Sequence, residues 1–211
     1  LIGMGGKALR RTLEAEGIRS LPILDAIERV PRELFVPPES RGQAYVNAPL
    51  PIGEGQTVSQ PYTVAVMLEL AGVAPGKKVL EVGSGSGYAA AVIAETLGDQ
   101  RMVVGLEVRA SLAAGAREHL TAAGYGEVRI IVGDGRLGYE EEAPYDAIIV
   151  SAEAREVPEA LRGQLSEGGN LVIPVREGFA AVMKKVHMEE GEYKESDHGA
   201  FSFVPLVGPN E

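Results

Sequence analysis

The chain has 211 residues, 45% of them hydrophobic, and a formal net charge of −10, which together fit a globular chain with one main domain. No apolar run approaches the roughly 20 residues that a membrane-spanning helix needs. The strongly negative net charge argues against a broad nucleic-acid-binding surface, since binding phosphates relies on clustered Lys and Arg. The sequence has no cysteine, which excludes disulfides and thiolate metal sites. We therefore expect a cytoplasmic protein without a metal site and without nucleic-acid or membrane partners. The oligomeric state is left open, with a monomer favoured.

The N-terminal part of the chain is predicted to be helical and then irregular. In residues 6–16 and 21–29 apolar positions recur at helical spacing, with charged residues on the other faces. Three prolines between residues 31 and 38 end this pattern, and the stretch up to Tyr62 is rich in Pro, Gly, Gln and Ser without a clear period. We expect two short helices and an ordered loop region, so that residues 1–62 precede the main part of the fold.

From residue 63 onward the pattern alternates between helix and strand. Helices are expected at residues 63–70, 88–97, 110–123 and 158–165, and strands from Lys78 and at 101–106, 128–132, 145–150 and 169–174. Such alternation predicts an α/β fold with a doubly wound, mostly parallel sheet. Residues 180–188 and 200–206 resemble strands with no long helix between them, which indicates an antiparallel pair at the sheet edge. Residues 63–211 are thus predicted to form the core, in one compact unit with residues 1–62.

An apolar strand runs directly into three glycines at every second position in residues 79–88, V-L-E-V-G-S-G-S-G-Y. Glycine has no Cβ and tolerates positive φ, so a bound nucleoside can lie against the backbone amides of this turn. The dinucleotide fingerprint G-x-G-x-x-G would need glycine in place of Tyr88. The observed spacing resembles instead the first motif of Rossmann-like S-adenosylmethionine-dependent methyltransferases. This resemblance implies cofactor contacts at Glu81, Gly83, Ser84, Gly85, Ser86 and Gly87.

Two further acidic residues follow the next two strands. Glu107 lies about 20 residues after Gly87, where an acidic residue binds the ribose hydroxyls in dinucleotide and S-adenosylmethionine folds. Asp134 follows the third strand and can accept a hydrogen bond from an adenine amino group. Either residue alone would be interpreted as a solvated loop acid, but both lie where open α/β sheets bind ligands. The predicted cofactor site therefore also includes Glu107, Val108, Gly133, Asp134 and Gly135.

The loop before the sheet indicates a family. Residues 48–62 read A-P-L-P-I-G-E-G-Q-T-V-S-Q-P-Y, which closely resembles the signature of protein-L-isoaspartate O-methyltransferases, P-L-P-I-G followed by G-Q-T-I-S-Q-P. Further resemblances lie at V-P-R-E-L-F-V-P (30–37), A-Y (44–45), Q-L-x-x-G-G-x-L-V-I-P-V (164–175) and F-V-P-L (203–206). They span nearly the whole chain in the family's order.

This resemblance implies a protein repair reaction. A methyl group would pass from S-adenosylmethionine, leaving S-adenosylhomocysteine, to the free α-carboxylate of an L-isoaspartyl residue in a damaged protein or peptide. The ester would then cyclise to a succinimide that hydrolyses partly to aspartate. A carboxylate is already ionised at neutral pH and needs no general base. The family pattern assigns catalysis to Ser59, cofactor covering to Gln56, Thr57 and Val58, and peptide contacts to Ile52, Ser59 and Val204.

Several alternatives stay open at this point. Ser59 can instead cap the helix that begins near Pro61. A methyltransferase that acts on a small molecule or on RNA would share the cofactor motif, and a binding protein could recognise isoaspartyl sites or S-adenosylmethionine without transferring methyl. Asn47, Glu54 and Glu153 depart from the residues frequent in the family, and Glu153 adds a negative charge whose direction the sequence does not give.

Overall fold

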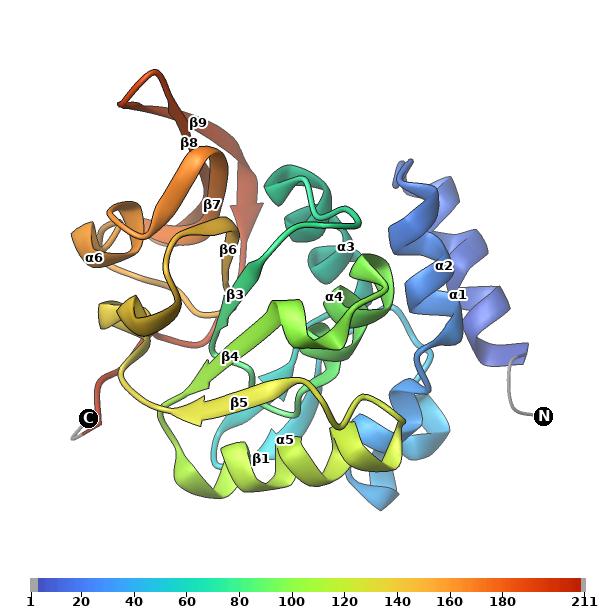
Figure 1. The fold of residues 1–211 in the computed structure, drawn as a ribbon. Helices are drawn as coiled ribbons and strands as arrows, with labels where there is room; N and C mark the ends of the chain where they lie inside the picture. The colour runs from blue at the N-terminus through green and yellow to red at the C-terminus, as the bar shows by residue number, and fades with distance from the viewer. Residues whose placement is uncertain (1–3, 210–211) are drawn as a thin grey trace.

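The structure, a computed structural model, describes residues 4–209 (Figure 1). It begins with two helices, α1 (Met4–Ala15) and α2 (Leu21–Arg29), which bury Leu9, Leu13 and Ile23 on their apolar faces. After two 3-10 turns, η1 (Arg32–Phe35) and η2 (Pro38–Gln43), the chain forms an antiparallel hairpin of β1 (Leu50–Gly53) and β2 (Gln56–Val58). The predicted loop region is therefore partly regular, and its two strands are too short to show a period in the sequence.

A seven-stranded sheet forms the centre of the molecule, with the strand order β5-β4-β3-β6-β7-β8-β9. Its strands are β3 (Val79–Val82), β4 (Val103–Glu107), β5 (Arg129–Val132), β6 (Tyr145–Val150), β7 (Leu165–Glu177), β8 (Ala180–Glu189) and β9 (Glu192–Phe201). The pairs from β5 to β7 are parallel, whereas β8 and β9 are antiparallel to their neighbours. The predicted Rossmann-like, mostly parallel sheet with antiparallel C-terminal strands is confirmed.

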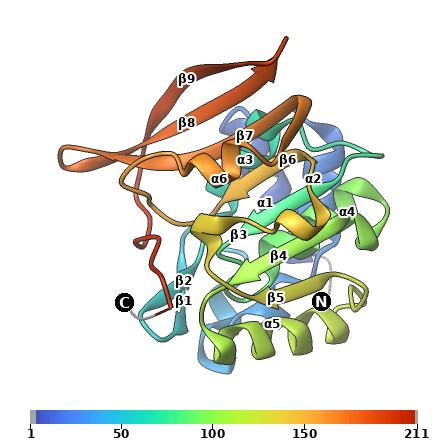
Figure 2. The ribbon, with the colours of Figure 1, turned by 60° about the vertical axis from the view of Figure 1, so that its left-hand side comes forward.

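Helices cover both faces of this sheet (Figures 1 and 2). They are α3 (Pro61–Ala71), α4 (Tyr88–Leu97), α5 (Ala110–Ala122) and the short α6 (Glu159–Arg162), with 3-10 turns at Gln100–Met102, Gly135–Leu137 and Glu140–Glu142. One hydrophobic cluster joins α1 to α5 to one face, and a second joins Leu161 of α6 to the other. Because successive side chains of a strand point to opposite faces, Val79 belongs to the first cluster and Leu80 to the second. None of the helices within residues 4–209 is long and apolar enough to cross a membrane.

The predicted position of the last strand is wrong. The strand that pairs with β8 is Glu192–Phe201, and residues 202–206 form only an isolated bridge between Pro205 and Glu153. Most side chains of β9 are exposed because it is the outermost strand, so its sequence lacks the apolar alternation of a buried strand. The apolar residues after it fold back as an irregular segment toward the β1–β2 hairpin (Figure 2). The helix predicted at 158–165 is also shorter than expected, because β7 already begins at Leu165.

Candidate active site

The glycine-rich turn between β3 and α4 is held open by backbone hydrogen bonds. The N–H groups of Gly83 and Ser84 donate to the carbonyl of Leu106 on β4, at 2.8 and 3.0 Å. Gly83, Gly85 and Gly87 have φ values of +83°, +52° and +87°, which strongly favour glycine. A Cβ on Gly85 would lie 3.2 Å from the Cδ1 atom of Ile52 in β1, so this turn passes directly beneath the hairpin. Ile52, predicted to contact a peptide, therefore packs on the glycine turn.

Glu107 holds the same turn from the side. Its Oε2 atom accepts a hydrogen bond from the N–H of Gly85 at 2.8 Å, and Oε1 accepts from the N–H of Arg109 at 3.0 Å. The carboxylate is almost fully buried at the carboxyl end of β4. It is thus fixed beside the turn, where one of its oxygens can also accept from the hydroxyls of a ribose.

A narrow cavity of about 50 Å³ lies between the carboxyl ends of the parallel strands, the hairpin and the returning C-terminal segment. Its walls combine the carboxylate of Glu107, glycine backbone, apolar side chains and the polar side chains of Gln56, Thr57, Arg109 and Ser151, which are groups that suit the chemistry of S-adenosylmethionine. The lining residues are Gln56, Thr57, Val82, Gly83, Gly85, Leu106, Glu107, Val108, Arg109, Gly135, Ser151, Ala152 and residues 204–207. Most of the predicted cofactor residues thus meet here or in the buried cavity next to it.

Asp134 and Gly133 do not line the narrow cavity. Both oxygens of Asp134 are engaged by the side chain of Arg136, with Nη2 2.7 Å from Oδ2, and this ion pair holds the pKa of Asp134 below its ordinary value. Gly135 does reach the cavity, and a Cβ there would lie 2.3 Å from Cγ1 of Val82, so close packing on β3 requires glycine. The adenine contact of Asp134 stays a prediction.

A smaller buried cavity, of about 30 Å³, lies next to the narrow one and shares Gly83 and Gly85 with it. Four polar side chains line it, those of Glu81, Ser84, Ser86 and Tyr88, and so do Val58 and Ser59. The side chains of Glu81, Ser84, Ser86 and Tyr88 each have a buried polar atom without a hydrogen-bond partner in the described chain. Burial raises the pKa of Glu81 to about 8, and the nearby Glu107 adds to this shift. Glu81 is therefore placed beneath the glycine turn as a carboxyl group that is largely protonated at neutral pH.

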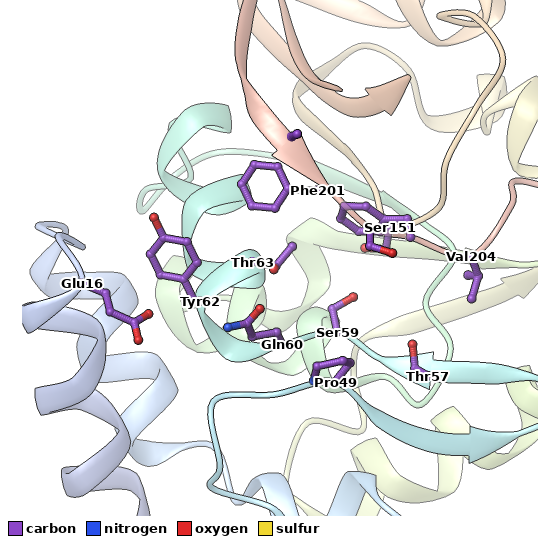
Figure 3. A pocket seen from close by; sticks show the side chains of 13 residues that line it. Glu16, Pro49, Thr57, Ser59, Gln60, Tyr62, Thr63, Ser151, Phe201 and Val204 are labelled. Carbon is purple, nitrogen blue, oxygen red and sulfur yellow. The ribbon is translucent and has the colours of Figure 1, made fainter. Parts of the chain in front are cut away.

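A wide cleft lies beside the turn, and Figure 3 shows the side chains that line it. Its volume of about 770 Å³ is typical of a ligand-binding pocket. The hydroxyls of Thr57, Ser59 and Ser151 border it, and none of the three makes a hydrogen bond within residues 4–209. Thr57 and Ser151 also line the narrow cavity, and Ser59 lines the buried one. The remaining lining residues are Glu16, Pro49, Gln60, Tyr62, Thr63 and residues 200–204.

Ser59 does not cap helix α3. The residue at the N-cap position is Gln60, which makes no side-chain capping bond, and the N–H of Tyr62 donates instead to Oδ1 of Asn47 at 3.0 Å. The amide of Asn47 in turn donates to Glu16 at 2.8 Å. The capping role that was open for Ser59 is therefore filled from another part of the chain, which leaves the Ser59 hydroxyl available to a ligand.

Two residues that depart from the family's usual pattern hold the cover of the site in place. The carboxylate of Glu54, at the tip of the hairpin, accepts from the hydroxyl of Ser111 and lies 3.8 Å from the guanidinium of Arg109. Glu153 pairs with Arg176, so its charge does not point into the wide cleft. Its backbone N–H donates to Val204 at 2.8 Å and its carbonyl accepts from Leu206 at 2.7 Å. Both residues thus anchor segments that cover the glycine turn.

Sequence reasoning did not assign Ser151, Tyr62 or Phe201 to the site. Ser151 follows β6, which lies directly beside β3 in the sheet, and its position at this reversal of strand order was the signal that could have located it. Phe201 is at the end of the unexpected strand β9. Within residues 4–209 there is no group of three or more His, Cys, Asp and Glu side chains that could hold a metal ion.

The parallel sheet, its glycine turn and the acid at the end of β4 define a Rossmann-like S-adenosylmethionine-dependent methyltransferase. Residues 5–211 match the family described as protein-L-isoaspartate(D-aspartate) O-methyltransferase. The chain is 49% identical over 202 residues to the protein-L-isoaspartate O-methyltransferase of Methylorubrum populi, covering 95% of this chain and 93% of that one. It is 50% identical over 204 residues to that of Ignicoccus hospitalis, with 95% and 96% covered. The chain belongs to the protein-L-isoaspartate O-methyltransferase family.

Solved structures agree with this assignment. A structure of a protein-L-isoaspartate O-methyltransferase superposes with a TM-score of 0.87 at 29% identity, over 97% of this chain and 66% of that longer chain. A Plasmodium falciparum relative, solved with S-adenosyl-L-homocysteine bound, gives a TM-score of 0.85 at 27% identity, with 95% and 97% covered.

Proposed function

We propose that the protein esterifies the free α-carboxylate of L-isoaspartyl residues in damaged proteins and peptides, and that the wide cleft receives this residue. The observation that carries the proposal is the set of three unpaired hydroxyls, on Thr57, Ser59 and Ser151, where the wide cleft meets the two cavities of the glycine turn. A hydroxyl can donate to a carboxylate without neutralising it. No Lys or Arg lines the cleft within the described residues, so the incoming carboxylate would keep its nucleophilic charge.

S-adenosylmethionine, when bound, supplies a methyl group on a sulfonium sulfur. The residues of this chain would then act by position. Glu107 and the glycine turn would fix the nucleoside, and Ser59 would orient one carboxylate oxygen toward the methyl carbon. Such positioning can contribute roughly 7 to 11 kcal/mol to lowering a barrier. Transfer between a cation and an anion cancels charge, so a site largely closed to water favours it.

Residues 1–62 would contribute to this function separately from the rest of the chain. They supply the hairpin over the glycine turn and Glu16, Pro49, Thr57, Ser59 and Gln60 of the cleft. We therefore propose that residues 1–62 recognise the peptide and cover the cofactor, while residues 63–211 bind the cofactor. Val204 would contact the peptide from the C-terminal side. The cytoplasmic location and the monomeric state stay predictions.

The test is methyl-ester formation on two peptides that differ only in carrying L-isoaspartate or L-aspartate at one position. Labelled S-adenosylmethionine is the methyl donor, and S-adenosylhomocysteine binding is measured on the same preparation. Ester on the isoaspartyl peptide alone supports the proposal. Cofactor binding with no ester on either peptide contradicts it, and would direct attention to small molecules, to RNA or to a binding protein without transferase activity.

A further inference from the structure

Arg32 is the largest fully buried side chain in the described chain, and it has no acidic partner there. Its side chain has no exposed surface, and its guanidinium donates only to backbone carbonyls. Nη1 donates to Ala44 at 2.6 Å and to Val46 at 3.4 Å, and Nη2 donates to Ala48 at 3.3 Å and to Ser59 at 3.0 Å. All four carbonyls belong to the segment of residues 44–59, which ends at the proposed catalytic serine.

A buried cation without a carboxylate is costly, because it leaves water without gaining the attraction of an opposite charge. Burial accordingly lowers the pKa of Arg32, although arginine keeps its proton in proteins. Packing alone would be served by an apolar side chain of similar size. The distinctive property of the guanidinium is its flat, rigid set of donors, which fixes several acceptors relative to one another.

The same guanidinium lies over the ring of Tyr88, with 5.2 Å between Cζ of Arg32 and the ring centroid. Tyr88 is the first residue of α4 and directly follows Gly87 of the glycine turn. Arg32 therefore contacts both the segment of residues 44–59, through its N–H groups, and Tyr88, the first residue after the glycine turn. No other side chain in residues 4–209 donates to the backbone of Ser59.

We propose that Arg32 is a positioning residue for methyl transfer, which sets the place of Ser59 relative to the glycine turn through the Ser59 carbonyl and the Tyr88 ring. It lines neither the wide cleft nor the narrow cavity, so it would act through the residues that it holds in place. This inference rests on the proposed function of Ser59. In-line transfer is sensitive to such placement, since a misplacement of about 1 Å can cost about 100-fold in rate.

The test compares Arg32→Lys and Arg32→Met with Val186→Ala, a core truncation on β8 at a residue that lines neither the wide cleft nor the two cavities. Titration with S-adenosylhomocysteine counts the binding-competent sites in each preparation. We expect kcat per competent site to fall about 100-fold in Arg32→Met and somewhat less in Arg32→Lys, with peptide KM and S-adenosylhomocysteine affinity near wild type. Val186→Ala should keep the wild-type kcat per site.

Three results would overturn the proposal: an unchanged kcat per site in both Arg32 variants, a loss explained by weaker S-adenosylhomocysteine binding, or an equal loss in Val186→Ala. If the Arg32 variants do not fold, nitrogen-15 NMR of the wild type decides. Separate, slowly exchanging Nη signals are expected from a guanidinium held by four carbonyls, and one averaged signal would contradict it. Failure of the proposed function is seen separately, as absence of ester formation by the wild type.

Discussion

The carboxylate of Glu107 accepts a hydrogen bond from the backbone N–H of Gly85, which joins the end of β4 to the middle of the glycine turn. Glu107→Gln replaces one acceptor oxygen by an NH₂ group that cannot accept. Because hydrogen bonds to charged groups contribute about 1.5–3 kcal/mol, we expect S-adenosylhomocysteine affinity to fall by roughly 10- to 100-fold. Isothermal titration calorimetry measures this, with Glu118→Gln on exposed α5 as the control. Equal affinity in both variants would contradict the role of Glu107.

Gly85→Val should abolish cofactor binding. Gly85 has a φ of +52°, which a β-branched residue adopts only under strain, and the new side chain would also press on Ile52. The control is Gly115→Ala within α5, where the nearest atom to the added Cβ is 3.9 Å away. That change should leave binding intact and raise stability by up to about 1 kcal/mol. Retention of near-normal S-adenosylhomocysteine affinity in Gly85→Val would show that the turn does not contact the cofactor.

Ser59→Ala should lower turnover and leave cofactor affinity nearly unchanged. The loss of one hydrogen bond to a charged carboxylate corresponds to about 10- to 100-fold in kcat/KM. Ser202→Ala is the matched control, because Ser202 lines the same cleft but neither of the cavities at the glycine turn. Initial rates on the isoaspartyl peptide measure both variants. If Ser59→Ala weakens cofactor binding as strongly as Gly85→Val does, the substrate role of Ser59 is misassigned.

Glu81 makes the stability of the cofactor-free protein depend on pH. Its pKa is raised by burial from 4.5 to about 8 in the folded state, so between these values the folded protein holds a proton that the unfolded chain has lost. The contribution of Glu81 to stability is therefore fully present below pH 4.5, falls as the pH rises toward 8, and is constant above that. Glu81→Gln removes this dependence. Between pH 4.5 and pH 8 the free energy of unfolding of the variant, relative to that of the wild type, should therefore rise by at most a few kcal/mol, at about 1.4 kcal/mol per pKa unit.

Urea unfolding of both proteins at several pH values, without cofactor, gives this difference directly. The comparison with Glu81→Gln cancels the other titrating groups, such as Asp134, whose lowered pKa has the opposite effect on stability. A difference between the two proteins that stays constant from pH 4.5 to 8 would contradict a protonated Glu81.

Local chemistry explains which parts were predictable from the sequence. Gly83, Gly85 and Glu107 are found from spacing because a turn at a strand end and an acid at the next strand end are short-range features. Ser59 was predicted as a site residue through the resemblance of its loop, and the structure places it on the wall of the wide cleft. By contrast, the position of Ser151 beside the turn depends on β6 pairing with β3, and no local pattern encodes strand order. The same holds for Arg32, whose carbonyl partners lie 12 to 27 residues away in the sequence.

The strand β9 could not be predicted from the hydrophobic pattern of the sequence. Hydrophobic periodicity reports burial, and an outer strand exposed on most positions has no such signal. The last strand was instead predicted at residues 200–206, because residues 203–206 are apolar, and these residues line the wide cleft and the narrow cavity.

Thr57, Ser151 and Val204 each belong to the walls of both the wide cleft and the narrow cavity. A peptide seated in the cleft would therefore lie directly against a nucleoside bound in the narrow cavity. We expect a compulsory sequence of events, in which S-adenosylmethionine enters before the peptide and the esterified peptide departs before S-adenosylhomocysteine. Product-inhibition kinetics would then show S-adenosylhomocysteine competing with S-adenosylmethionine but not with the peptide. The wall that the cleft and the narrow cavity share would in this way determine the order of binding and release in the whole catalytic cycle.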